Sequence, residues 1–273
     1  MIQVVGRHRA GYLITGKLVF CQRGEFMRSL LLFLLTTLFF ASALAGDSTP
    51  EPPAALTADH PALQPYHAVY TAHYNRMPIE AHRYLRAEED GFSLVTEARN
   101  LLGRIHEEEN FYLDEQGLLI PVSYVYNRSI LGTSRKETIT VDGAAGTSVT
   151  RRKGEETQLD FHPGQLGPLS YQIAMAADLA THNGIEDAHQ FSYTVIHRGR
   201  LRDYTYEVTA QDIELDTPLG TLSTIQLERV RESDDRETVL WLAPELNYLP
   251  VKLMQIEDGT TYEMSIKSFT LEP

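Results

Sequence analysis

The chain has 273 residues, with 24 lysines and arginines against 37 aspartates and glutamates, which gives a formal net charge of −13. Hydrophobic residues make up 42% and charged residues 22%, a composition typical of a folded globular protein. The acidic balance argues against a nucleic-acid partner, because proteins that bind nucleic acid carry a basic surface. A single cysteine excludes a disulfide framework and any metal site built from several cysteines.

An apolar run over Leu30–Phe40 predicts an export signal. It is too short to cross a bilayer, which takes about 20 residues. Arg28 precedes the run, and the small-x-small sequence Ala43-Leu44-Ala45 follows it. We therefore expect a secretory signal peptide over residues 27–45, cleaved after Ala45, and a periplasmic protein that does not span the membrane after cleavage. The alternative is that the run stays attached as a membrane anchor.

Residues 1–26 are basic and carry no pattern, although a signal peptide has only a few residues before its apolar core. We expect that Met27 is the native start and that residues 1–26 are an over-called beginning. Gly46 stands at the cleavage point, where a lipoprotein would have a cysteine. Cys21 falls in the segment that is lost, so the mature chain is expected to contain no cysteine.

The mature chain is expected to begin with a flexible linker over residues 46–65, which is rich in proline, alanine, aspartate and threonine. A single domain is expected over residues 66–273. Turn signals such as Asp142-Gly143 and Arg198-Gly199 recur along it and separate runs rich in tyrosine, valine, threonine, isoleucine and leucine. This rhythm is typical of an antiparallel all-β protein.

Alternation along Tyr66–Tyr74 places the tyrosines and alanines on one face of a strand. Residues 248–257 and 260–271 flank Asp258-Gly259 and predict the last hairpin. The fold class is therefore mainly β. We expect a strongly curved antiparallel sheet or an open barrel, with one principal helix packed on it.

That helix is predicted over Leu169–His182, where alanines and long unbranched residues replace the β pattern. Pro168 suits the first helical position, and Gly184 suits the end. An apolar stripe formed by its leucines, isoleucine, methionine and alanines predicts packing against the sheet. The alternative is a lid over a cavity.

The chain has no nucleophile elbow, phosphate-binding loop or dinucleotide fingerprint. The sequence His106-Glu107-Glu108-Glu109 resembles the start of a zinc motif, but Asn110 stands where the second histidine would be. We therefore predict no catalytic residue, no cofactor and no metal site. The run Glu107–Glu109 is expected on an edge strand or a solvated face.

Aromatic residues are the more suggestive feature, since tyrosine combines an apolar face with a polar tip. Lining a cleft, such residues would suit contacts with a glycan or a lipid. The candidate cleft residues are Tyr70, Tyr126, Tyr204, Tyr206, Met175 and Trp241. The alternative is ordinary packing within the sheet, and Trp241 in particular is expected to anchor the core.

The C-terminal third contains the string Trp241-Leu242-Ala243-Pro244-Glu245-Leu246-Asn247-Tyr248-Leu249-Pro250-Val251, preceded by Asp216–Leu222. With these motifs and the helix start at Gly167-Pro168, the chain resembles the domain-of-unknown-function 3108 family of exported bacterial proteins. The resemblance spans roughly Tyr66–Leu271 and implies a β-rich fold without an established activity. The family's usual acidic residue before the helix proline is Gly167 here. By analogy of fold, the architecture is similar to the half-barrel carriers of periplasmic lipoproteins.

Taken together, these features predict a non-catalytic periplasmic binding or carrier protein for an apolar or amphipathic ligand, such as a lipid, a glycan or a peptide. Two alternatives stay open. One is a cell-envelope hydrolase that uses paired carboxylates, which would need two such groups about 5–10 Å apart in a cleft. The other is a structural or assembly factor without a cavity, whose partner would be an envelope protein.

Overall fold

The computed structural model describes Pro53 and residues 55–74, 77–101, 103–130, 132–182, 188–231, 236–257 and 259–272. The expected signal peptide, the expected over-called start, Gly184 and Asp258 lie outside these residues. The elements are β1 Tyr66–Tyr74, β2 Met77–Glu88, β3 Gly91–Asn100, β4 Gly103–Leu113, β5 Leu119–Ile130, β6 Thr133–Asp142, β7 Thr147–Arg152, β8 Glu155–Asp160, α2 Ser170–Thr181, β9 Gln190–His197, β10 Arg200–Thr217, β11 Gly220–Arg229, β12 Arg236–Ala243, β13 Leu249–Glu257 and β14 Thr260–Leu271, with short 3-10 helices η1 Pro61–Leu63 and η2 Pro244–Leu246.

The described strands form one 14-stranded antiparallel sheet in the order β8-β7-β6-β5-β4-β3-β2-β1-β14-β13-β12-β11-β10-β9. Two meanders, β1–β8 and β9–β14, are therefore joined by the pairing of the first strand with the last. That joint runs from Tyr66 opposite Leu271 to Ala72 opposite Met264. The predicted mainly β fold with one principal helix is confirmed.

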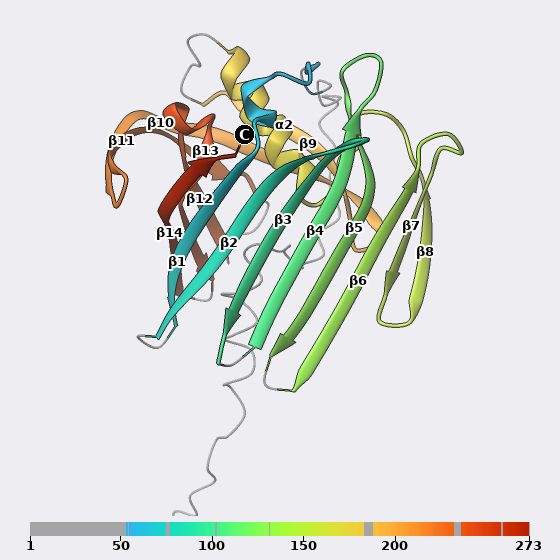
Figure 1. Ribbon diagram of the computed structural model, residues 1–273, viewed down its shortest axis with the longest axis horizontal. Coiled ribbons are helices and arrows are strands. Elements are labelled where there is room, and N and C mark those ends of the chain that lie inside the picture. Colours follow the sequence, from blue (N-terminus) through green and yellow to red (C-terminus); the bar gives the residue numbers. More distant parts are fainter. Residues whose placement is uncertain are drawn as a thin grey trace, which may run out of the picture.

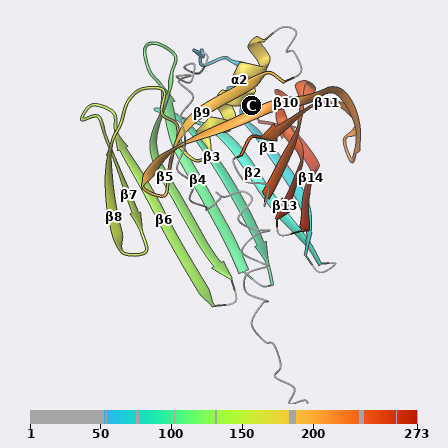
Figure 2. The ribbon, with the colours of Figure 1, turned by 180° about the vertical axis from the view of Figure 1, so that it is seen from behind.

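The sheet is strongly curved but not closed into a barrel, because its order ends at β8 and β9. The two edges approach each other where the β9–β10 turn meets β8. A Cβ atom on Gly199 would lie 2.9 Å from the Cβ atom of Thr157. Figures 1 and 2 show α2 at one end of the sheet, next to β9 and β10.

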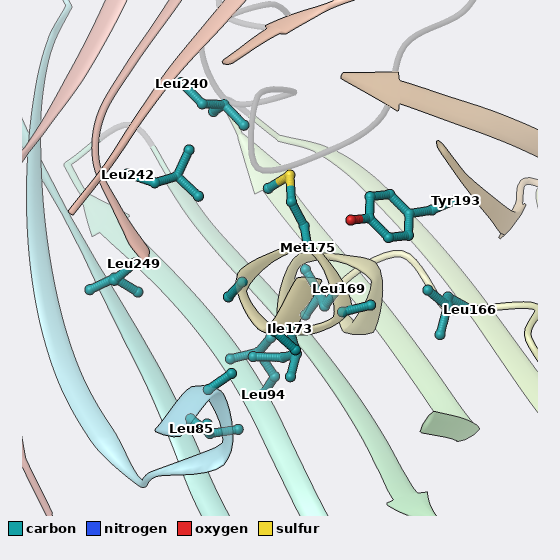
Figure 3. Close-up of a cluster of buried hydrophobic side chains, with 14 of the residues drawn as sticks. Leu85, Leu94, Leu166, Leu169, Ile173, Met175, Tyr193, Leu240, Leu242 and Leu249 are labelled. Atoms are coloured by element: carbon teal, nitrogen blue, oxygen red, sulfur yellow. The ribbon is translucent and has the colours of Figure 1, made fainter. Parts of the chain in front are cut away.

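Alternation decides which side chains enter the concave interior. Tyr66, Ala68 and Tyr70 of β1 are buried, as the pattern predicts. The helix α2 contributes a second set of apolar side chains between the two meanders. Figure 3 shows Met175 directed toward Leu240, on the opposite side of the helix from Ile173. Most of α2 is buried, so the predicted packing of this helix against the sheet is confirmed.

The domain begins earlier than the predicted linker boundary at residue 65. Leu56 is only 4% exposed and Leu63 only 1% exposed, and both belong to the core. The Leu56 amide donates to the Gly117 carbonyl at 2.8 Å, where a Cβ atom on Gly117 would meet the Leu56 carbonyl oxygen at 2.4 Å. The prolines of this segment therefore shape a packed turn and η1, because leucines between them supply apolar surface for burial.

Candidate functional site: a cavity beneath helix α2

One row of inner-face residues crosses β1 to β7 at the same level and contains four charged side chains. The strand register gives the row as Ala68, Arg83, Thr96, Glu107, Tyr126, Glu137 and Arg152. Since successive residues of a strand face opposite sides, one register places all of these on the concave face. The concave face of the sheet therefore carries a row of charged side chains among the apolar residues of the core.

The expectation that Glu107–Glu109 forms an edge strand or a solvated face is wrong. The strand β4 lies between β3 and β5, and Glu107 and Glu109 are both 0% exposed. They face inward with Ile105 and Phe111, which are also buried. The Tyr124 hydroxyl donates to Oε1 of Glu107 at 2.6 Å, and burial raises the pKa of Glu107 well above its ordinary value.

Glu109, on β4, caps the N-terminus of α2. Its Oε2 atom accepts the backbone amides of Leu169 at 2.6 Å and Ser170 at 3.2 Å. A carboxylate at a helix N-terminus satisfies unpaired amides and opposes the helix dipole. Burial nevertheless raises the pKa of Glu109 to about 7.

Gly167 leaves the space that this carboxylate occupies. A Cβ atom on residue 167 would lie 2.0 Å from Oε1 of Glu109, which no side chain tolerates. The family resemblance implies an acidic residue close to this point in the chain, before the helix proline. In this protein the carboxylate at the helix start comes from β4 instead, about 60 residues away in sequence.

A cavity lies in the interior between α2 and the β10–β14 side of the sheet. Its lining combines aromatic and aliphatic groups with polar side chains and three arginines: Tyr70, Arg83, Pro168, Tyr171, Gln172, Met175, Tyr204, Tyr206, Arg229, Arg231, Thr238, Leu240, Pro250, Leu253, Gln255 and Met264. The cavity volume that is open to the centres of water molecules is about 80 Å³, which is enough for several waters. A larger ligand therefore needs the lining to move.

Tyrosines form one wall of this cavity. The hydroxyls of Tyr171 and Tyr206 are 3.2 Å apart, and the Tyr171 ring meets the Tyr204 ring edge-on with 5.2 Å between their centroids. The guanidinium of Arg229 lies 3.7 Å from the centre of the Tyr204 ring. This wall offers hydroxyls, ring faces and a cation within one surface.

Four of the six candidate cleft residues lie in this lining: Tyr70, Met175, Tyr204 and Tyr206. Tyr126 is buried on the same inner face but is not part of the lining. Trp241 is placed differently, because Leu240 and Leu242 take the inward positions of β12. Its ring is half-buried, with the Lys252 ammonium 5.2 Å from the ring centre.

The sequence-based reasoning missed Tyr171 and the three arginines. For two of these arginines, the sequence pattern does predict an inward position. Arg229 and Arg231 continue the period-two series of the buried Leu227, which predicts the same inward face. Arginine is normally exposed, so residue type alone argues against inward positions for these two side chains.

Within the described ranges, no group of three or more histidine, cysteine, aspartate or glutamate side chains is placed to hold a metal ion. No helix in that same part of the chain has the length and apolar character needed to cross a membrane.

The profile of one protein family matches residues 69–267, and that family is described as "Protein of unknown function (DUF3108)". The chain belongs to this family. The family resemblance predicted from the sequence motifs is therefore confirmed. The match covers β2 to β13 and all of the cavity lining, but the family description supplies no activity. No curated protein matches the chain.

The solved structures to which the chain is similar share little sequence with it. A β-barrel-like protein of domain of unknown function DUF1849 from Brucella abortus is 11% identical, with a TM-score of 0.47, covering 77% of this chain and 99% of its own. A DUF1089 family protein from Pseudomonas aeruginosa is 14% identical, with a TM-score of 0.33, covering 79% and 95%. A porin-like protein from Bacteroides uniformis is 11% identical, with a TM-score of 0.32, covering 81% and 100%.

Proposed function

We propose that this DUF3108 protein is a non-catalytic binding or carrier protein that holds an amphipathic ligand in the cavity beneath α2. The observation that carries the proposal is the composition of the lining. The side chains of leucine and methionine and the rings of tyrosine supply apolar surface. Tyrosine hydroxyls, glutamines and arginines supply polar contacts. Ligand sites combine these features, with a few polar groups fixing the orientation of a ligand that is otherwise held by apolar contact.

The burial of Glu107 and Glu109 argues against the hydrolase alternative. Paired-carboxylate hydrolysis requires both groups to face a cleft that admits substrate and water. These two carboxylates are 0% exposed, and among the described residues the cavity lining contains no carboxylate. A binding role makes no such demand on the lining.

We also propose that the chain is exported to the periplasm, on the strength of the apolar run, Arg28 and the Ala43-Leu44-Ala45 cleavage sequence. Fractionation of cells that express the full chain, followed by N-terminal sequencing of the periplasmic protein, tests this. A mature N-terminus at Gly46 is the expected result. A protein retained in the membrane fraction with the run attached would contradict it.

Binding is tested with the neutral, apolar fluorophore N-phenyl-1-naphthylamine, whose emission rises when it leaves water. We expect saturable binding by the wild-type protein and strong weakening in Leu253→Trp, which fills the lining from β13. Lys252→Trp is the matched control, since the neighbouring side chain faces the opposite side of the strand.

Both variants are first compared with wild type by circular dichroism and urea unfolding. Leu253→Phe, which fills less volume, replaces Leu253→Trp if the larger ring disrupts folding. Equal probe binding by wild type and by a folded cavity-filling variant would refute the proposed site. Native mass spectrometry of the exported protein, followed by solvent extraction, then identifies any ligand that copurifies.

A further inference from the structure

Three arginines line the cavity, and they come from separate parts of the sheet. Arg83 comes from β2, Arg229 ends β11, and Arg231 follows two residues later. The whole chain carries a net charge of −13, so the mean charge of the protein has the opposite sign to that of its cavity. The described part of the lining contains these three cations and no carboxylate.

Within the described residues, none of the ion pairs shorter than 4 Å involves these arginines. Neighbouring arginines do have carboxylate partners: Arg152 pairs with Glu137 and Arg236 pairs with Glu257. The contacts that the structure describes for the cavity arginines are with neutral groups. Nε of Arg83 donates to the Tyr66 hydroxyl at 2.9 Å.

The other two cavity arginines are held in the same way. The guanidinium of Arg229 stacks over the Tyr204 ring. Nη2 of Arg231 donates to Oγ1 of Thr238 at 2.9 Å, while its Nε is buried and has no hydrogen-bond partner among the residues that the structure describes. Glu107 acts on Arg83 electrostatically but is hydrogen-bonded to Tyr124 and lies outside the lining.

The pKa values of Arg231 and His197 agree with a positive interior, although neighbouring tyrosines raise the pKa values of Arg83 and Arg229 despite the burial of these two side chains. Burial and the charges of Arg229 and Arg236 lower the pKa of Arg231 to about 10. Burial and several arginines, among them Arg198 and Arg229, lower the pKa of His197 well below its ordinary value. Like charges that are gathered in a poorly solvated space repel one another at an energetic cost, which an anion placed among them would offset.

We infer that the ligand is an amphiphile with a single anionic group, a carboxylate or a phosphate, which Arg229 and Arg231 bind together with Arg83. Guanidinium groups hold both kinds of anion through paired hydrogen bonds. The methionine, leucine and tyrosine surfaces of the same cavity accept the apolar part of the molecule. This inference rests on the proposed binding function and adds that the head group of the ligand is negatively charged.

The test compares three competitors against bound N-phenyl-1-naphthylamine: oleate, oleyl alcohol and inorganic phosphate. Oleate and oleyl alcohol share the same chain and differ in the charge of the head group. Each is used below the concentration at which it forms micelles. We expect oleate to bind at least about 10-fold more tightly than the alcohol, and phosphate alone to compete weakly.

Substitution of the arginines locates the head group. Arg229→Gln and Arg231→Gln are each expected to weaken oleate binding by about 10- to 100-fold while leaving oleyl alcohol unchanged. Arg229→Lys, which keeps the charge, is expected to recover part of the loss. Arg99→Gln is the control, because Arg99 is exposed and lies outside the cavity. If loss of the stacking on Tyr204 disrupts folding of the Arg229 variants, the comparison relies on Arg231→Gln alone.

The outcomes separate this inference from the proposed function. Equal affinity for oleate and oleyl alcohol, with probe binding intact, would overturn the anionic ligand and leave the cavity as a site for neutral amphiphiles. Phosphate competing as well as oleate would overturn the amphiphile in favour of a free anion. Absence of probe binding and of competition by any of the three would refute both the inference and the proposed function.

Discussion

The buried carboxylate of Glu109 predicts that the protein loses stability as the pH rises. Its pKa is raised to about 7 in the folded state, against 4.5 for an ordinary glutamate. A raised pKa means that the folded chain holds the proton more tightly, so its stabilising effect is complete below about pH 4.5 and is lost as the pH passes about 7. The full difference corresponds to about 3 kcal/mol, most of which falls between about pH 5 and pH 8.5.

The assay is urea unfolding of wild type and Glu109→Gln at these two pH values. The amide cannot ionise, so the fall in unfolding free energy with pH should be about 2–3 kcal/mol smaller in the variant than in wild type. Glu107, whose pKa is also raised, leaves a residual slope in the same direction. Glu115→Gln changes an exposed carboxylate and should leave the slope unaltered. Equal slopes for wild type and Glu109→Gln would refute the burial of this charge.

Three further predictions concern the same region. Gly167→Ala should destabilise the protein by about 2 kcal/mol or more, and by clearly less in a Glu109→Ala background where the clashing carboxylate is gone; additive effects in a double-mutant cycle would contradict the close approach. Leu179→Ala should lower the unfolding free energy by about 2–5 kcal/mol, because the side chain is fully buried; a change below about 0.5 kcal/mol would show that α2 is not packed there. Tyr124→Phe removes the hydroxyl that donates to Glu107 and should cost about 1–3 kcal/mol in urea unfolding, whereas an unchanged midpoint would argue against that hydrogen bond.

Period-two alternation was enough to orient β1, because Tyr66, Ala68 and Tyr70 share one face while His67 and Thr71 lie on the other. The same rule places Glu107 and Glu109 inside, between Ile105 and Phe111. The sequence-based reasoning let charge override the period and expected a solvated run. Charge is a poor guide here, because a hydroxyl and two helix amides, all distant in sequence, make burial of these carboxylates tolerable.

Size alone does not place Trp241, which is expected to anchor the core. Its neighbours Leu240 and Leu242 occupy the inward positions, and its half-buried ring packs against the core cluster without being part of it. The strand order was also beyond local reasoning. Hairpin rhythm predicts that successive strands pair, but pairing of β1 with β14 depends on the curvature of the whole sheet.

That pairing of the first and last strands sets the order in which the protein can fold. Each meander consists of neighbouring strands and can form early from local contacts, whereas the β1–β14 joint links Tyr66 to Leu271, about 200 residues apart. The joint lies in the middle of the sheet, so until Leu271 is available both β1 and β13 remain open edges. A chain that is cut or stalled before β14 therefore exposes two strands with unpaired backbone edges. We expect such fragments to associate with one another rather than to fold.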